Sequence, residues 1–302
     1  VTSPSFSKNK GLQEEISKYF LNPSLNLDGI KFSQNQLIEF IKHADAVIVG
    51  LEKINSNVLS KCPNLKIISK FGVGLNNIDL EACKKRNVFI GWTGGVNKLS
   101  VAEMTIGFML MLARNLFTTS NELKNGNWNK SGGFLLSGKT VGIIGLGHSG
   151  KELVKLLKPF GCKILVNDII DQNKYYKENN LEETSKDIVF KTSDIISIHT
   201  PHNETTNNMV NIDILKTMKK SAYIINTARG GIINEKDLKY ALQSNIIAGA
   251  AIDAYLEEPP MDIEFLKLPN LICTPHIGGN AKEAVESMGM SAIQHLKNYY
   301  NL

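Results

Sequence analysis

The sequence predicts an α/β protein of two domains, one of which is inserted into the other. Short apolar runs alternate with amphipathic stretches, which is typical of buried parallel strands connected by helices. This alternation occurs within the first 97 residues and starts again at Thr140. A long helical pattern separates the two series, and another follows the second series. With 302 residues, of which 42% are hydrophobic, the chain is long enough to bury two ordinary cores.

The first domain is predicted to be a small parallel sheet with helices. Strands are expected at 46–50, 65–69 and 88–90, where apolar residues are concentrated. Helical patterns lie between them, at about 34–42 and 79–86. Strands that alternate with helices in this way favour parallel pairing, because each crossover needs a connecting segment.

A long apolar-rich helix is predicted over 99–123, and it connects the two series. Its Met104, Met109 and Met111 could form a ligand-binding stripe. Core packing, or contact with a second copy of the chain, explains them better, because Met fills irregular apolar interfaces.

The second domain repeats the order of strand and helix. Strands are expected at 140–144, 163–167, 195–199, 222–226, 248–252 and 271–273. Helices are expected after the first of these strands, as far as about Phe160, and over 235–243. The last helical pattern, at about 281–299, has no strand after it, so we expect it to return to the first domain. The predicted domains are therefore 1–97 together with 282–302, and 98–281.

Composition and charge argue against several classes of function. The net charge is +5, but the basic residues are scattered, whereas nucleic-acid binding needs a concentrated basic face. The longest nearly apolar stretch, at 104–113, is too short to span a bilayer, so no membrane partner is expected. The four cysteines are far apart, which predicts neither a metal site nor disulfides and favours a cytoplasmic protein with reduced thiols.

A glycine-rich loop directly follows the strand at 140–144. Gly145, Gly147 and Gly150 form the pattern G-x-G-x-x-G, and an amphipathic helical pattern comes next. The first glycine permits a tight turn, the second lets a pyrophosphate approach the backbone, and the third lets helix and strand pack closely. The helix N-terminus would offer N–H groups and the positive end of its dipole to phosphates. A dinucleotide site in mid-chain predicts a nucleotide-binding domain inserted into another domain, with a cleft between two lobes.

An acidic residue ends the next predicted strand and indicates which dinucleotide binds. Asp168 follows Gly145 by 23 positions, close to the spacing expected of the acid that binds the adenosine ribose hydroxyls. The same carboxylate would repel a 2′-phosphate, so NAD is favoured over NADP. The alternative is an exposed acid at the strand end with no ligand.

Three polar residues follow later strands of the same predicted sheet, where ligands bind in such folds. Arg229 follows the strand at 222–226, Glu258 comes after the strand at 248–252, and His276 follows the strand at 271–273. These groups suit hydride transfer between an alcohol and a carbonyl. The imidazole would move the proton, the carboxylate would orient the ring, and the guanidinium would bind an anionic substrate. Glu257 is the alternative partner for the imidazole.

The sequence resembles the D-isomer-specific 2-hydroxyacid dehydrogenases over nearly its whole length, with the phosphoglycerate dehydrogenase branch nearest. The resemblance rests on the glycine loop and on three segments that follow it in order: Asn-Thr-Ala-Arg-Gly-Gly at 226–231, Ala-Gly-Ala-Ala-Ile-Asp with Glu-Glu-Pro-Pro over 248–260, and Thr-Pro-His-Ile-Gly-Gly at 274–279. It implies a Rossmann-type doubly wound parallel sheet, inserted into a smaller flavodoxin-like α/β substrate domain. It also implies a homodimer, with the predicted helix at 99–123 as the contact.

The resemblance implies roles for individual residues. Arg229 and the backbone N–H groups around Val73 and Gly74 would hold the substrate carboxylate. His276 would be the acid/base, and Glu258 would pair with it. Asp253 would bind the nicotinamide amide, and Thr200 and Thr227 would line the cofactor path. The whole expected cofactor site comprises Gly145, Gly147, His148, Ser149, Gly150, Asp168, Thr200, Thr227, Asp253 and Gly278.

The chain also departs from the family pattern. Asn76 stands where Asp is common, and His148 stands where Arg often meets the pyrophosphate. The segment 91–95, which contains Trp92 and the Gly94-Gly95 pair, replaces one that usually carries Pro. Lys70 occupies a position often held by Arg in phosphoglycerate enzymes, which keeps a positive charge for a phosphorylated substrate.

The predicted function is therefore an NAD-dependent oxidoreductase acting on a small anionic D-2-hydroxy acid or 2-keto acid. Candidate substrates, in falling order, are 3-phosphoglycerate, hydroxypyruvate or glyoxylate, and D-lactate. A different class is a non-catalytic NAD-sensing protein, like the related transcriptional corepressors, which retain the Arg-Glu-His set. A third interpretation is a related enzyme acting on an unusual acid such as phosphite.

Overall fold

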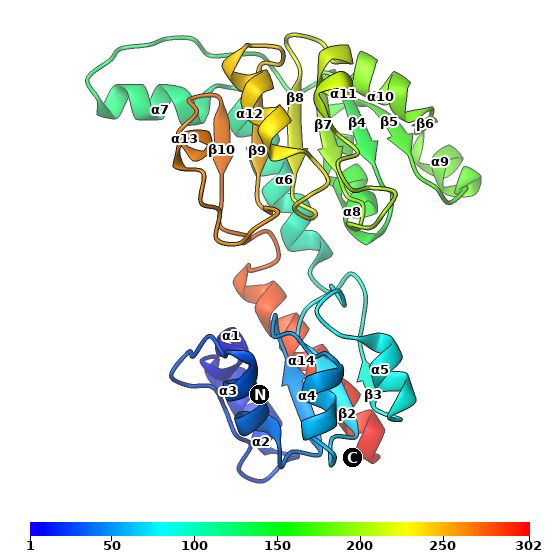
Figure 1. Cartoon of the computed structure of the whole chain (residues 1–302). Helices are drawn as coiled ribbons and strands as arrows, with labels where there is room; N and C mark the ends of the chain where they lie inside the picture. Colours follow the sequence, from blue (N-terminus) through cyan, green and yellow to red (C-terminus); the bar gives the residue numbers. More distant parts are fainter. The chain divides into compact units, whose positions relative to one another are not determined.

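The computed structural model describes all 302 residues and divides into two compact units (Figure 1). One unit comprises Val1–Asn97 and Asn280–Leu302, and the other comprises Lys98–Gly279. The predicted boundary between 97 and 98 coincides with that of the structure, whereas the return to the first unit begins at 280, two residues before the predicted 282. Gly278, just before this boundary, belongs to the second unit, and its carbonyl accepts a 2.6 Å hydrogen bond from the Ser100 hydroxyl of the same unit.

The first unit is a three-layer α/β structure. Its sheet contains β1 (Ala46–Val49), β2 (Ile67–Lys70) and β3 (Phe89–Gly91), all parallel and in that order. The helices are α1 (Pro4–Ser7), α2 (Lys10–Ser17), α3 (Gln34–Ile41), α4 (Ser56–Lys61), α5 (Leu80–Lys85) and α14 (Lys282–Tyr300). This is the flavodoxin-like layering that the sequence predicts, with three strands in the sheet.

Alternating side chains of the strands give this sheet two apolar faces. Val47 and Ile68 pack with α3, α4 and α5 in one cluster, whereas Ile48 and Ile67 pack with α1, α2 and α14 in the other. The Ser69 hydroxyl also donates to Ala292 O of α14 at 2.7 Å. The C-terminal helix is therefore part of the first unit, as predicted.

The second unit is built on seven parallel strands in the order β10-β9-β8-β7-β4-β5-β6. Their bounds are β4 (Thr140–Ile144), β5 (Lys163–Asn167), β6 (Glu182–Glu183), β7 (Ile195–Ile198), β8 (Tyr223–Asn226), β9 (Gly249–Ile252) and β10 (Leu271–Cys273). The first strand in sequence, β4, pairs with both β5 and β7, so the strand order reverses beside it. This is the doubly wound Rossmann topology, in which ligands bind at the carboxyl ends beside the reversal.

Helices cover both faces of this sheet (Figure 1), and two apolar clusters lie beneath them. The helices of this unit are α6 (Lys98–Ala113), α7 (Leu116–Lys124), α8 (His148–Leu157), α9 (Asn173–Asn179), α10 (Lys186–Thr192), α11 (Ile212–Thr217), α12 (Glu235–Gln243) and α13 (Ile263–Leu266). A 3₁₀ turn at Lys158–Phe160 extends α8. The predicted helices at 235–243 and up to Phe160 match these elements.

The single helix predicted over 99–123 is wrong, because the chain breaks between α6 and α7. Asn115 has a φ of 52°, in the left-handed region that Asn tolerates better than most residues. The carbonyl of Ala113, at the end of α6, accepts from Phe134 N at 2.7 Å, a partner 21 positions away. Met109 is fully buried in the core, and Met104 and Met111 pack against the same cluster.

No single helix has both the length and the apolar character needed to span a membrane. The helices α6 and α7 meet that test of length and composition only as a pair, and they are bent by 63° at their junction.

Candidate active site

The glycine loop lies at the carboxyl end of β4, beside the reversal of strand order. Gly145 has a φ of +92°, and a Cβ there would come within 2.8 Å of the His199 carbonyl at the end of β7. A Cβ on Gly150 would lie 2.3 Å from Gly145 O, so the first turn of α8 packs tightly against the loop. Gly147 has no neighbouring atom within 4 Å of a Cβ position, so the space over this part of the loop is open.

The N-terminus of α8 offers donors on the same side. Gly147 is the N-cap residue, and no side chain caps the helix. His148 is exposed and Ser149 is half-buried in the first turn. The first N–H groups of a helix have no acceptor within the helix and carry the positive end of its dipole, so they suit an anionic diphosphate.

Asp168 directly follows β5 and bonds to the backbone of the glycine loop. Its carboxylate accepts from Leu146 N at 2.5 Å and from Ile170 N at 2.9 Å. A carboxylate has about four acceptor positions, so capacity remains for ribose hydroxyls. Next to it, Ile169 and Ile170 are 99% and 64% exposed. The sequence reasoning missed this apolar pair, which a planar base could cover, although its place directly after a strand-end acid was a usable signal.

A buried hydroxyl without a partner supports a ligand at this loop. Thr200 Oγ1 is buried and makes no hydrogen bond, which is rare for such a group. The methyl group of Thr200 lies beside Gly145, where an added Cβ would be 2.9 Å away. The neighbouring His199 is uncharged at neutral pH, because burial lowers its pKa to about 4. The loop, the uncapped helix, the strand-end acid and this hydroxyl together fit a dinucleotide.

The predicted histidine and carboxylate meet at the carboxyl ends of β9 and β10. His276 Nδ1 lies 2.7 Å and 2.9 Å from the two carboxylate oxygens of Glu258. Tyr255 N donates to the same carboxylate at 3.1 Å, which fixes its orientation. His276 has a φ of 55°, an uncommon left-handed conformation that costs free energy and clusters at functional sites. Glu258, rather than Glu257, is the acid that contacts the imidazole.

Asp253 holds the loop that carries this histidine. It is 1% exposed, and it accepts from the Thr274 hydroxyl at 2.6 Å and from the N–H groups of Ile277 at 2.8 Å and Gly278 at 2.7 Å. These bonds lie on both sides of His276 in the sequence. The carboxylate therefore positions the histidine, a role that the sequence reasoning missed, while its predicted contact with the nicotinamide amide stays a prediction.

Arg229 and Thr227 follow β8 in a turn that Asn226 braces. The Asn226 amide donates to Arg229 O at 2.8 Å and accepts from Ala228 N at 3.1 Å. Thr227 is buried and shares a 3.0 Å hydrogen bond with Thr105 of α6. Burial lowers the pKa of the Arg229 guanidinium and the nearby Glu258 carboxylate raises it, so the group stays cationic at neutral pH.

Of the three residues predicted in the first unit, Lys70 ends β2, and Val73 and Gly74 follow it. Lys70 is 4% exposed, and its ammonium donates to Gly50 O and, at 2.8 Å, to the Asn77 side chain. It is thus a buried brace between two loops, not the exposed cation that a phosphate group needs. Val73 and Gly74 are half-buried, and their N–H groups donate to no acceptor within the chain. They are available to an anion.

The sequence model of one protein family matches the second unit. Its description is D-isomer specific 2-hydroxyacid dehydrogenase, NAD binding domain, and the match covers residues 106–278, more than half of the chain. The chain belongs to this family. The predicted NAD cofactor is confirmed at the level of the domain, and the chain is a member of a family of NAD-dependent oxidoreductases.

Similar proteins carry several names within the family. The chain is 36% identical to a D-3-phosphoglycerate dehydrogenase of Methanocaldococcus jannaschii over 98% of its own length but spans only 56% of that relative. It is 34% identical to a hydroxypyruvate reductase of Thermotoga maritima, with 95% of each chain covered. Among solved structures, a D-lactate dehydrogenase of Aquifex aeolicus, in complex with NAD and lactic acid, is 27% identical with a TM-score of 0.84, covering 98% and 94% of the two chains.

Replacing Asp168 by Ala is expected to weaken NADH binding by about 10- to 100-fold, because hydrogen bonds to a charged group contribute about 1.5–3 kcal/mol. NADPH binding should change much less, since the same substitution removes a charge that repels its 2′-phosphate. Titration of each cofactor by its fluorescence measures both dissociation constants. Asp168→Asn is the matched control for the backbone bonds to Leu146 and Ile170, because it keeps an oxygen acceptor. An unchanged ratio of the two constants would remove the proposed role of the carboxylate.

Proposed function

We propose that this protein transfers hydride between NAD and a small D-2-hydroxy acid or its 2-keto acid, with 3-phosphoglycerate as the first candidate substrate. The observation that carries the proposal is the contact between His276 and Glu258, with the cationic Arg229 within electrostatic reach of the same carboxylate. An acid/base, its orienting carboxylate and an anion-binding cation follow the ends of β8, β9 and β10, in a domain whose family binds NAD.

We infer that one ring nitrogen of His276 carries out the proton transfer. Because Nδ1 of His276 faces Glu258, the proton exchanged with the substrate oxygen belongs to Nε2. In the direction of oxidation, Nε2 accepts the hydroxyl proton as the C–H bond breaks and the carbonyl forms, and in reduction it returns that proton. Bound NAD supplies the hydride acceptor or donor. Glu258 orients the imidazole through its contact with Nδ1, while Arg229 and the N–H groups of Val73 and Gly74 bind the substrate carboxylate.

Hydroxypyruvate or glyoxylate is the second candidate, and two observations favour it. The chain is 34% identical to the hydroxypyruvate reductase of Thermotoga maritima, with 95% of each chain covered. In addition, the ammonium of Lys70 is bonded to Gly50 and Asn77, so binding a phosphate group there would break these bonds.

Oxidation of NADH with a panel of 2-keto acids tests the proposal. The panel contains 3-phosphohydroxypyruvate, hydroxypyruvate, glyoxylate and pyruvate, and the ranking of kcat/KM separates the candidates. Turnover of the phosphorylated acid ahead of hydroxypyruvate supports 3-phosphoglycerate as the substrate. Binding of NADH without turnover of any of the four would contradict a dehydrogenase and favour an NAD-sensing protein.

We also propose that two copies of the chain associate through the second unit. The segment 125–139, between α7 and β4, has no regular structure and loops out from the unit (Figure 1). Four large apolar side chains on α7 and this segment are half or more exposed: Leu116, Leu123, Trp128 and Leu135. Contiguous exposed apolar patches mark interaction sites on soluble proteins, and these side chains are the apolar surface that such a site on α7 and its loop would use.

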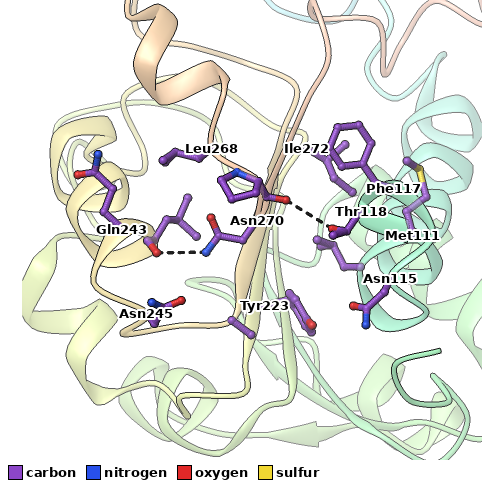
Figure 2. Close-up of a pocket in the computed structure, with 14 residues that line it drawn as sticks. Met111, Asn115, Phe117, Thr118, Tyr223, Gln243, Asn245, Leu268, Asn270 and Ile272 are labelled. Atoms are coloured by element: carbon purple, nitrogen blue, oxygen red, sulfur yellow. Dashed lines mark hydrogen bonds between the residues drawn. The ribbon is translucent and has the colours of Figure 1, made fainter. Parts of the chain in front are cut away.

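A pocket beside α7 is the surface on which we expect the second copy to dock. It has a volume of about 430 Å³ and is lined by side chains from α6, α7, β8, α12 and β10, among them Met111, Phe117, Tyr223, Gln243 and Ile272 (Figure 2). Thr118 donates to Pro269 O at 3.5 Å, and the Asn270 amide donates to Leu242 O at 3.1 Å, so hydrogen bonds hold its walls (Figure 2).

Trp128→Glu is expected to convert the dimer to monomers, because it places a charge on an apolar contact. Light scattering coupled to size-exclusion chromatography measures the mass of both proteins. Ile188→Glu serves as the control, since this side chain is also exposed but lies on α10, which does not line the pocket. A wild-type chain that elutes as a monomer would overturn the proposed association.

A further inference from the structure

Trp92 contacts the loop that we propose binds the substrate carboxylate. It directly follows β3, in the segment where the chain departs from the pattern of its family. Its indole Nε1–H donates to the carbonyl of Val73 at 2.9 Å, and the side chain is 43% exposed. No other side chain forms a hydrogen bond with the stretch from Gly72 to Gly74, so this contact constrains the orientation of the loop.

The bonded carbonyl and one of the available donors belong to the same peptide group. The carbonyl of Val73 and the N–H of Gly74 lie in one plane, and in a trans peptide they point in opposite directions. A donor that holds the carbonyl on one side therefore directs the N–H to the other side. Hydrogen bonding at the carbonyl also polarises the peptide and strengthens its N–H as a donor.

The orientation of this peptide depends on ψ of Val73 and φ of Gly74. Gly74 has no Cβ to restrict its φ, so the sequence leaves the peptide more freedom on that side. A fixed donor against Val73 O selects one orientation.

The residues on either side of Trp92 contact α14. The Thr93 hydroxyl shares a 2.8 Å hydrogen bond with His295 Nε2. On the other side of Trp92, a Cβ on Gly91 would lie 2.5 Å from the Cβ of His295, so β3 and α14 are in close contact. The indole thus extends from the segment 91–93, which contacts α14, to the loop at 72–74, where it bonds to Val73.

We propose that Trp92 is a positioning residue for substrate binding: its indole N–H fixes the Val73–Gly74 peptide so that Gly74 N–H faces the substrate carboxylate. This inference rests on the proposed function and adds to it a residue that selects for anionic 2-keto acids. Trp92 does not touch the reacting atoms, and it acts through the peptide that it holds.

Steady-state kinetics with glyoxylate and saturating NADH test this role. Trp92→Phe keeps an aromatic ring but removes the donor, and we expect KM to rise about three- to tenfold, the effect of one neutral hydrogen bond. The kcat and the dissociation constant of NADH should stay within about twofold of wild type. Trp92→Gln should restore much of the loss, because its amide nitrogen is as many bonds from Cα as the indole nitrogen.

Calorimetric titration with oxamate, a 2-keto acid analogue that is not reduced, tests the same contact without turnover. In the presence of NADH, the dissociation constant of oxamate should rise about three- to tenfold in Trp92→Phe and less in Trp92→Gln. Unchanged oxamate affinity in Trp92→Phe would overturn the inference. A merely structural role would instead lower the melting temperature and change kcat in both variants, and that result would overturn it too.

Failure of this inference differs from failure of the proposed function. If the wild-type chain turns over no 2-keto acid, the proposed function fails, while oxamate binding still decides the role of Trp92. If the wild-type chain is active and Trp92→Phe has a normal KM, the inference fails alone.

Discussion

Replacing His276 is expected to lower kcat by about 10²- to 10⁴-fold, the range that a positioned general acid/base contributes. The affinity for NADH should be nearly unchanged, because the imidazole is bonded to Glu258 beyond the ends of β9 and β10, whereas the glycine loop around Gly145 follows β4. Without the imidazole, the proton must be exchanged with water, which is a poorer donor and acceptor at neutral pH. Stopped-flow measurement of NADH oxidation in single turnover isolates this step from product release.

The choice of replacement matters because of the backbone at this position. His276 has a φ of 55°, and a residue with a Cβ pays about 1–2 kcal/mol in the left-handed region unless its side chain suits it. Asn is enriched there, so His276→Asn removes the acid/base with little added strain. His276→Ala should lose the same activity and also some stability. Thermal melting of the two variants separates the effects.

Glu258→Gln provides the matched test of the orienting carboxylate. Gln keeps an oxygen that can accept from Tyr255 N, but it removes the negative charge that faces Nδ1 of the ring. An intermediate loss of kcat is expected, smaller than that of His276→Asn. Near-wild-type activity in His276→Asn would refute the assignment of the acid/base whatever the result for Glu258.

Much of the second unit could be predicted from sequence because its strands are short, apolar and bounded by glycines or polar residues. The predicted strand at 140–144 is β4, and the predicted helix at 235–243 is α12. The small edge strand β6, at Glu182–Glu183, carries no apolar signal and was missed. The break at Asn115 was missed because it depends on Phe134, which bonds to the end of α6 from 21 positions away.

The residue types of the site could be predicted, but the direction of each side chain could not. Arg229, Glu258 and His276 stand out because they follow successive strands of a parallel sheet, whose carboxyl ends share an edge. The sequence does not reveal that Asp253 bonds to the residues around His276, since those contacts depend on how two loops pack. Nor does a lysine in a sequence show whether it is buried, as Lys70 is.

Arg229→Gln is expected to lower kcat/KM for the 2-keto acid by about 30- to 5,000-fold, because removing one partner of a buried charge pair costs about 2–5 kcal/mol. The loss should appear mainly in KM, since Arg229 binds the carboxylate before and during the reaction. The backbone turn should survive, because Asn226 bonds to the main chain of Ala228 and Arg229 and not to the guanidinium. NADH affinity, measured in the absence of substrate, should therefore stay close to wild type.

Arg229→Lys separates the charge of the guanidinium from its shape. Lysine keeps the cation but cannot present two parallel donors to a carboxylate. It also loses the Nη1 bond to Ala228 O, which at 2.7 Å orients the guanidinium. We expect a loss of about 10- to 100-fold, the value of one hydrogen bond to a charged group. If Arg229→Gln and Arg229→Lys both bind the keto acid normally, the carboxylate is held elsewhere. The N–H groups of Val73 and Gly74 would then have to carry its binding alone.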